Sequence, residues 1–500
     1  MPHGVTRGPA GRLVGSPWEV PMPGSSGATP SAPSRRECLD AEGRTARPTP
    51  HVLPLTAAQR KIWLAEQDAS GAHEAYRISQ CAHLHGPVDT GLFEAAMRQV
   101  LAEADTLRVR ITATPDGPVQ EVHPAADSAW ACVDVSGEPD PHGAARRWIA
   151  ADMAEPIDLA HGPLFRCALI ALRADHWLCY LSAHHVVADG YSLFLITRRF
   201  TRVYALLAAG EPVGASPFGS LADLVKADLD YRSSPRYAAD GAYWKRTFSD
   251  PPAPAPLPAR PAPTDGRQGT DSGYLAEQAL RVSGERPLAR PEALQKAALA
   301  AGIARSRFLC AAAAVYAHRL TAAPEVVIGL AVTGRPQRAL MTTPGVLHNI
   351  VPLRLRVHSG MPLAELLTQV DRAMNEAVAH QRYPGEDLAR DLGLPGSIAS
   401  RFSLIVNVMP LGRPLSMGGI PCTVSGVHVA AGRPACLKLL ALDRRDGAGL
   451  RLDVQATREQ YTRADLADHQ RRLLLLLDAM ATADPHRHVG ALHSGNLSNA

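Results

Sequence analysis

The chain has 500 residues, which is too many for one small core and suggests two lobes or domains of ordinary size. Hydrophobic residues make up 46% and charged residues 20%, a composition typical of a soluble globular protein. The 52 basic residues nearly balance the 48 acidic residues, and no basic stripe with interleaved aromatic residues occurs, so nucleic acid is not an expected partner.

The cysteines and the apolar segments give an expected location. Eight cysteines occur without a C-x-x-C pair, and several lie in apolar runs, a pattern that suits a reducing compartment. No segment reaches the roughly 18 uninterrupted apolar residues of a membrane span. The first residues lack the apolar core of a signal peptide. The sequence therefore predicts a cytoplasmic protein with no membrane contact.

Both ends of the chain differ from its middle. Residues 1–50 carry nine prolines and seven glycines with almost no periodicity, so we predict a disordered N-terminal extension. Residues 491–500 are expected to form a short tail. A further stretch, residues 251–263, holds seven prolines, which rule out regular structure and indicate an extended connection.

Order is expected to begin with a short helix that Thr56 caps and whose apolar side carries Ile62 and Trp63. A strand is predicted around residues 76–84. Residues 89–104 then have apolar side chains at helical spacing. Residues 163–170 favour another strand, which pairs in a hairpin with the next one.

Residues 184–192 are the most informative stretch of the chain. The short apolar run before them, residues 177–183, is typical of a buried strand. Residues 193–207 follow with the apolar spacing of an amphipathic helix, which Gly210 ends. The stretch therefore forms a loop between a strand and a helix, a place where a rigid scaffold can aim side chains into a cleft.

The residue types of this loop favour proton transfer. The neutral imidazole of His185, with a pKa near ~6.5, can accept a proton from an amine or a hydroxyl. Asp189 can hold the loop in shape, and Gly190 lets the backbone approach a substrate closely. Two plainer interpretations stay open. Both histidines, His184 included, could end a buried strand while Asp189 caps the next helix, or they could bind a metal, although no further ligands stand at suitable spacing.

The second half of the chain repeats the alternation of helices and strands. We predict an alanine-rich helix over residues 306–320 and a buried strand over residues 326–335. A hairpin is expected around Asp446–Gly447, followed by a long helix from about 462 to 481.

The pattern His-His-x-x-x-Asp-Gly-x-Ser at residues 184–192 resembles the HHxxxDG signature of the condensation domains of nonribosomal peptide synthetases, which belong to the chloramphenicol acetyltransferase-like superfamily. Other segments resemble further motifs of this family, in the family's order. They are Thr56–Trp63 (Ser/Thr-x-Ala-Gln-x-x-Leu/Ile-Trp), Leu107–Arg108 (the core of HExLRTxF), residues 163–170 (the PLFRA strand), residues 328–335 (IGxPVAGR), residues 345–354 (GxFVNTLPLR) and residues 380–384 (His-Gln-x-Tyr-Pro).

One motif departs from the family pattern. In the second motif Ala104 replaces the histidine and Asp105 stands in for the glutamate. Heterocyclisation relatives carry Asp in place of the first histidine, and epimerisation relatives carry a Glu-Gly-His-Gly-Arg segment; neither feature is found here. The resemblance therefore favours condensation itself.

The resemblance implies an α/β (α+β) fold of two chloramphenicol acetyltransferase-like lobes arranged as a V, with mixed sheets flanked by helices. Residues 51–225 would form the N-terminal lobe with the HHxxxDG motif, and residues 226–490 the C-terminal lobe. The second histidine would lie where the lobes meet.

The resemblance also assigns roles to residues. His185 would accept the amine proton or orient the attacking nitrogen, and His184 would be structural. Asp189 would hold the loop through Arg108, its expected partner in this family, or through Arg335. The candidate set is His184, His185, Asp189 and Gly190 at the reaction centre, Arg108 and Arg335 as supports of the loop, and Ser192 and Asn349 along the substrate channel.

The implied activity is transfer of an acyl or aminoacyl group from a carrier-protein phosphopantetheine thioester to an amine or hydroxyl acceptor, in natural-product (antibiotic) biosynthesis. No carrier, adenylation or thioesterase signature occurs, so we expect a freestanding, monomeric enzyme that meets acyl or peptidyl carrier proteins in trans and binds no cofactor or metal. Two alternatives stay open: a coenzyme A-dependent acyltransferase of the same superfamily, and a non-catalytic scaffold that binds carrier proteins.

Overall fold

The computed structural model describes residues 51–68, 76–124, 130–258, 280–282, 291–394, 397–410, 415–429, 436–444, 449–456 and 460–492. The predicted N-terminal extension, most of the C-terminal tail and the turn at Asp446–Gly447 lie outside these residues. Residues 251–258 of the proline-rich stretch are described and have no helix or strand, as predicted.

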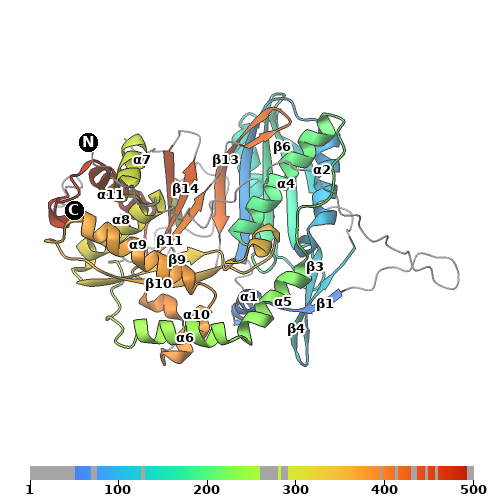
Figure 1. The fold of residues 1–500 in the computed structure, drawn as a ribbon. Coiled ribbons are helices and arrows are strands. Elements are labelled where there is room, and N and C mark those ends of the chain that lie inside the picture. The colour runs from blue at the N-terminus through green and yellow to red at the C-terminus, as the bar shows by residue number, and fades with distance from the viewer. Residues whose placement is uncertain are drawn as a thin grey trace, which may run out of the picture.

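Two lobes lie side by side, each with a six-stranded sheet and covering helices (Figure 1). The first lobe contains β1 (His51–Pro54), α1 (Ala57–Asp68), β2 (Arg77–His85), α2 (Thr90–Glu103), β3 (Val109–Thr114), β4 (Gly117–Val122), β5 (Trp130–Asp134), α3 (Pro141–Ala154), β6 (Phe165–Arg173), β7 (His176–His184), α4 (Gly190–Ala208) and α5 (Leu221–Arg232). The second contains α6 (Pro235–Thr247), β8 (Leu280–Val282), α7 (Pro291–Ala300), α8 (Arg305–Thr321), β9 (Glu325–Val332), β10 (Asn349–Arg356), α9 (Leu363–Ala379), α10 (Gly385–Asp391), β11 (Leu404–Pro410), β14 (Leu437–Arg444), β15 (Gly449–Ala456) and α11 (Arg463–Thr482).

The main sheet of the first lobe also includes β12 (Leu415–Met417) and β13 (Ile420–Val429). Its strand order is β12-β13-β2-β7-β6-β5, in which only the β5–β6 pair is parallel. Its central strand β7 is buried along nearly its whole length, as its apolar sequence predicts. Helix α4 covers this sheet with its predicted apolar stripe and packs on α2, where Phe200 meets Phe93 edge to face at 4.8 Å. A smaller sheet, β1-β4-β3, flanks the lobe.

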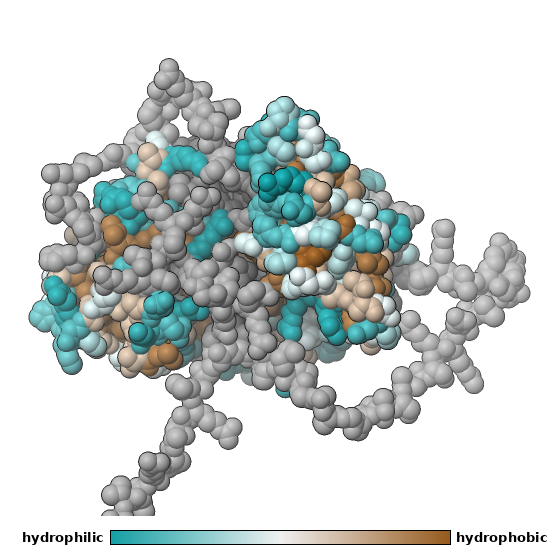
Figure 2. Space-filling model, turned by 90° about the horizontal axis from the view of Figure 1, so that it is seen from above, coloured by the Kyte–Doolittle hydropathy of each residue, from teal (hydrophilic) through white to brown (hydrophobic). Residues whose placement is uncertain are grey.

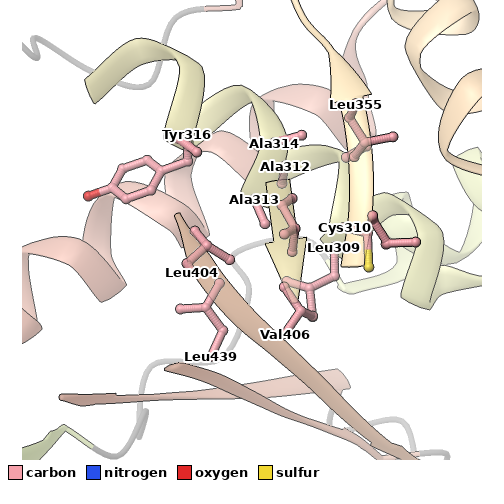
Figure 3. Close-up of a cluster of buried hydrophobic side chains, with 14 of the residues drawn as sticks. Leu309, Cys310, Ala312, Ala313, Ala314, Tyr316, Leu355, Leu404, Val406 and Leu439 are labelled. Atoms are coloured by element: carbon pink, nitrogen blue, oxygen red, sulfur yellow. The ribbon is translucent and has the colours of Figure 1, made fainter. Parts of the chain in front are cut away.

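The sheet of the second lobe has the order β10-β9-β11-β14-β15-β8. The predicted hairpin partners β14 and β15 pair antiparallel. Helix α8 packs against this sheet with fully buried alanines, because small side chains let its backbone approach the strands closely. Figure 3 shows three of these alanines near Leu404, Val406 and Leu439 of the strands.

The predicted boundary between the lobes at residue 225 is only partly correct. It falls inside α5, whose Leu221, Leu224 and Val225 all belong to the core of the first lobe. In addition, β12 (Leu415–Met417) and β13 (Ile420–Val429) come from the predicted C-terminal lobe but complete the sheet of the first, where β13 pairs with β2. Figure 1 shows β13, in the colour of the chain's last quarter, beside the early strands. The C-terminal lobe is therefore not one continuous segment.

The two cores meet along β14. Leu437 and Leu439 point into the core of the second lobe, whereas Leu440 and Leu442 belong to the core of the first. This alternation follows from the period of two in a strand. Because one strand serves both cores, the lobes form a continuous packed structure at the place where the motif loop lies.

Figure 2 shows hydrophilic residues interspersed with smaller hydrophobic areas over the first lobe, seen from above. Among the described residues no single helix is long and apolar enough to cross a bilayer; α7 and α8 pass by length and composition only as a pair, across a bend of 98°.

Candidate active site at the junction of the lobes

The predicted strand, loop and helix around the motif are confirmed. The loop leaves β7 with His185 N–H donating to the Tyr76 carbonyl at 2.6 Å, and a tight turn follows in which Val187 N–H donates to the His184 carbonyl at 3.0 Å. Helix α4 then begins at Gly190, with the Asp189 side chain accepting from Ser192 N–H. The cap expected in the plainer interpretation is thus present, and it coexists with the contacts described below.

Side chains from the first lobe hold the carbonyls of this loop. The Gln59 amide donates to the Val186 carbonyl at 3.0 Å, and the Thr106 hydroxyl donates to the Val187 carbonyl. Gln59 belongs to the opening motif and Thr106 directly precedes the Leu107–Arg108 core of the second motif. Both motifs therefore fix the shape of the loop, although the sequence alone did not mark these two residues as part of the site.

The imidazole of His185 lies buried at the junction, 2% exposed, and is neutral at pH 7. Burial lowers its pKa to about 4, against opposing effects of its own backbone carbonyl and of Asp189, while Lys438 and His184 lower it further. Its ring stacks on that of His348, with centroids 4.7 Å apart and planes inclined by 26°. The loop of the first lobe and the segment before β10 of the second thus meet at this ring.

The imidazole of His184 is buried and engaged within the protein. Its Nδ1 accepts from the Val186 N–H at 3.2 Å, which leaves the proton on Nε2. That Nε2 lies 3.3 Å from Oε2 of Glu66, with both side chains almost inaccessible. These contacts support the structural role expected for His184, whose ring connects the backbone of the loop to Glu66 of α1.

Asp189 forms a buried ion pair with Arg335 of the second lobe. The Arg335 Nη1 lies 2.7 Å from Asp189 Oδ2, and neither side chain is more than 2% exposed. Burial alone would raise the pKa of Asp189, but the Arg335 charge and hydrogen bonds outweigh it and lower the pKa to about 2. The predicted Arg335 partner is confirmed, and the carboxylate is too weak a base to take a substrate proton.

The expected pairing of Arg108 with Asp189 is wrong. Arg108 Nη2 lies 2.8 Å from Asp105 Oδ1, and its Nη1 donates to the His123 carbonyl. Asp105 stands three residues earlier on the same short helical turn, so it captures the guanidinium locally. Arg108 therefore supports the edge of the β3–β4 sheet, while a residue 146 positions after Asp189 supplies the positive charge.

Ser192 was expected along a substrate channel, but the structure buries it completely in the same hub. Its Oγ lies 2.7 Å from Asp189 Oδ1 and 2.6 Å from the Gly345 carbonyl, and it accepts from the Gly345 N–H at 2.9 Å. Arg335 also donates to the Gly345 carbonyl, at 2.6 Å. Ser192 is therefore a joint between α4 and the segment before β10.

Asn349 lies at the start of β10, half-buried, beside the junction. Its side-chain amide donates to the carbonyls of Gln381 at 3.0 Å and Tyr383 at 2.7 Å, both in the predicted His-Gln-x-Tyr-Pro segment. Both hydrogens of the amide group are thereby engaged by backbone carbonyls, which disfavours the expected contact with substrate. The same two hydrogen bonds join the segment of residues 345–354 to the His-Gln-x-Tyr-Pro segment.

Gly190 opens α4 directly after the motif, and the side chain of Met409 in β11 faces it. A Cβ added at Gly190 would come within 3.2 Å of the Met409 Cε. The glycine thus leaves room at a helix N-terminus, where backbone N–H groups and the helix dipole favour negative charge. Among the described residues, no group of three or more His, Cys, Asp or Glu side chains is placed to hold a metal ion.

The structure thus places a buried imidazole at the junction of two α/β lobes, on a loop that a buried ion pair holds in shape. The family model for the Condensation domain matches residues 50–494. The chain belongs to the condensation-domain family of nonribosomal peptide synthetases, as its motifs predicted.

Relatives and solved structures agree with this assignment. The chain is 35% identical over 430 residues to a dimodular nonribosomal peptide synthase of Bacillus subtilis (strain 168) and 37% identical over 445 residues to an isonitrile lipopeptide synthase of Streptomyces coeruleorubidus. These matches cover 86% and 88% of the chain but only 18% and 29% of those proteins. The chain thus spans less than a third of each of these relatives.

Two condensation-domain structures are similar over nearly their whole length. The starter condensation domain of rhizomide synthetase, as a variant in complex with C8-CoA, superposes with a TM-score of 0.78 at 35% identity, over 88% of this chain and 97% of that one. The first condensation domain of the calcium-dependent antibiotic synthetase gives a TM-score of 0.77 at 33% identity, over 88% and 98%. The expected mixed α/β fold of this family is confirmed.

Proposed function

We propose that this chain transfers an acyl group from the phosphopantetheine thioester of a carrier protein to an amine or hydroxyl acceptor, forming an amide or ester in natural-product biosynthesis. The observation that carries the proposal is the buried, neutral imidazole of His185 at the junction of the lobes. The proposal includes no resident cofactor or metal and places the enzyme in the cytoplasm.

The reaction needs a nucleophile to attack the thioester carbonyl, so that a tetrahedral oxyanion forms and the carrier thiol then leaves. A neutral imidazole can accept a hydrogen bond from the N–H or O–H of the acceptor. This bond orients the acceptor so that the lone pair of its attacking nitrogen or oxygen points at the thioester carbonyl. Backbone N–H groups in the first turn of α4, which starts at Gly190, are candidate donors to the oxyanion.

The low pKa of His185 decides when the proton moves. An imidazole with a pKa near 4 is too weak a base to remove a proton from a neutral amine before that amine attacks the carbonyl. After attack the nitrogen becomes cationic and much more acidic, so the same imidazole can take its proton and pass it to the departing thiolate. The site therefore favours hydrogen-bonded positioning first and proton transfer after the C–N bond has formed.

The names of the relatives suggest a first class of donor. One relative is called an isonitrile lipopeptide synthase, and a similar structure is a starter condensation domain in complex with C8-CoA. We therefore propose medium-chain fatty acyl groups on a carrier as the first donors to test, with amino acids as acceptors. The coenzyme A-dependent alternative is tested by the same experiment.

The test is intact-protein mass spectrometry of carrier proteins loaded with octanoyl or aminoacyl groups, offered with candidate amines and alcohols. We expect acyl loss and a new amide or ester with the wild type, and at least a 100-fold slower reaction with His185→Ala. The matched control is His161→Ala, which replaces a histidine whose side chain is exposed.

Other outcomes are informative in different ways. Equal product with wild type and His185→Ala would overturn the role of His185. Transfer from octanoyl-CoA but from no carrier would establish the coenzyme A-dependent alternative. Carrier binding that survives His185→Ala, without transfer by either protein, would indicate a scaffold.

A further inference from the structure

We propose that His348 is a positioning residue of the active site, whose ring covers one face of the His185 imidazole and holds it in a dry, fixed orientation. The proposal rests on the function proposed above and extends it to a residue that the family motif does not provide. In the motif matched by residues 345–354, GxFVNTLPLR, the place of His348 carries Val. An imidazole there gives this chain an aromatic surface against His185.

The geometry is that of a close stack. The two ring centroids are 4.7 Å apart and the planes are inclined by 26°. Rings at this separation are in van der Waals contact, so His185 cannot rotate freely without displacing His348. His185 Nδ1 and His348 Nδ1 are both buried without a hydrogen bond of good geometry to any described residue. Packing against a ring, more than hydrogen bonding, therefore fixes the His185 side chain.

The position of His348 is itself firmly determined. The preceding Leu347 N–H donates to Asp189 Oδ2 at 3.3 Å, and the following Asn349 is anchored through its amide to two carbonyls. Behind it, Gly334 has a φ of +68°, and a Cβ there would lie 1.9 Å from the Leu347 carbonyl oxygen. The ion pair that shapes the histidine loop thus also places the ring that covers it.

The charged groups around the stack favour two uncharged rings. Burial lowers the pKa of His348 well below 6.5, with further lowering by His185, Lys61 of α1 and Lys438 of β14; Asp189 opposes them. Two imidazolium ions in contact would repel each other strongly. At neutral pH both rings are therefore uncharged, and the His185 imidazole has one face covered by His348.

The experiment compares His348→Ala, His348→Phe and, as a matched control, His358→Ala in the full chain. His358 is exposed and lies just after β10 in the same lobe. Two measurements are made on each protein: the pH dependence of the acyl-transfer rate, and the rate at which diethyl pyrocarbonate modifies His185, followed by peptide mass spectrometry. This reagent attacks unprotonated, accessible imidazole nitrogens and needs no substrate.

We expect His348→Ala to slow transfer at least about tenfold at neutral pH, because the imidazole is less well aligned. The pH at which the acyl-transfer rate of this variant falls off on the acid side should move from about 4 towards 6.5, because water reaches His185 and its pKa rises. Carbethoxylation of His185 should accelerate several-fold. His348→Phe keeps the ring surface and should retain the low pH of this fall-off, slow modification and most of the rate; His358→Ala should match the wild type.

Two results would overturn the proposal. One is a His348→Ala variant with wild-type modification rate and pH profile. The other is a His348→Phe variant as impaired as His348→Ala, which would assign the role to the imidazole nitrogens. Because the modification rate is independent of carrier and acceptor, a wild type that transfers no acyl group would count against the proposed function alone. Thermal unfolding of each variant separates misfolding from lost positioning.

Discussion

Asp189 is the residue on which the contacts of the site converge. It caps α4, forms the ion pair with Arg335 and accepts from the backbone of Leu347. A buried carboxylate survives only where its lost hydration is replaced, and here the replacements come from the first turn of α4, from Arg335 and from the segment before β10. The resulting pKa of about 2 makes the Asp189 carboxylate a weak base.

The Asp189–Arg335 pair gives a prediction at this scale. Arg335→Met leaves the carboxylate buried without its cation and should lower the free energy of unfolding by about 3–5 kcal/mol. The double variant Asp189→Asn/Arg335→Met leaves no buried charge, and its amide can still cap α4, so it should recover much of that loss. Urea unfolding of the two singles and the double measures the coupling. Losses that simply add would contradict the buried ion pair.

The contacts of a residue could be predicted from the sequence where a motif carries its own geometry, but not where two distant segments must meet. His185, Asp189 and Arg335 could be identified because their motifs match closely. Arg108 was misassigned because its local partner Asp105 stands at the weakened motif. The stack of His348 on His185 could not be predicted, because it forms only once the segment before β10 docks on the loop.

Single elements were predicted well, since their periodicity is local. The helices α4, α8 and α11 and the strands β6, β7 and β9 lie within a few residues of their predicted limits. The crossing of β12 and β13 into the first sheet left no local signal, because strand pairing depends on contacts far apart in sequence. The predicted division of the chain at residue 225 missed this crossing for the same reason.

The turn after β9 provides a prediction at the scale of elements. Gly334 and Gly302 have nearly equal φ angles, +68° and +65°, but only a Cβ at Gly334 would strike another segment, the Leu347 carbonyl. Gly302→Ala should therefore cost about 1–2 kcal/mol of folding free energy from its backbone conformation alone. Gly334→Ala should cost more and also slow acyl transfer, because the segment carrying His348 must move.

Urea unfolding and the carrier assay, applied to both glycine variants, check this. Similar losses of stability in both, with unchanged transfer by Gly334→Ala, would show that the close approach does not determine the site.

At the scale of the whole molecule, β13 ties the lobes together by completing the sheet of the first. Two adjacent residues of β13, Thr423 and Val424, point to opposite faces of the sheet. Val424 is buried in the core of the first lobe, and Thr423 is exposed. Val424→Asp should destabilise the fold by several kcal/mol, roughly 3–5, because it buries a charge without a partner. Thr423→Asp should change stability by less than about 1 kcal/mol. Equal effects on the urea midpoint would mean that the crossing strand is not part of the core.

The stability of the whole molecule should also depend on pH through histidines kept neutral by the fold. Burial lowers the pKa of His83 to about 4, helped by the neighbouring His176, His85 and His142, and burial lowers that of His185 to about 4. Between pH 4 and 6.5 the unfolded chain therefore binds more protons than the folded one, so stability falls as pH falls through this window. Above pH 6.5 both states are neutral at these sites and the contribution is constant.

His83 allows this to be tested away from the active site, because it lies at the opposite end of β2 from the strand end that pairs with His184. After allowance for its partial exposure, its share should be about 1–2 kcal/mol. His83→Gln should remove that share, so that its free energy of unfolding falls less between pH 7 and pH 4.5 than that of the wild type. His358→Gln, at an exposed site, serves as the control for replacing a histidine. A wild-type slope in His83→Gln would mean that folding does not lower the pKa of His83.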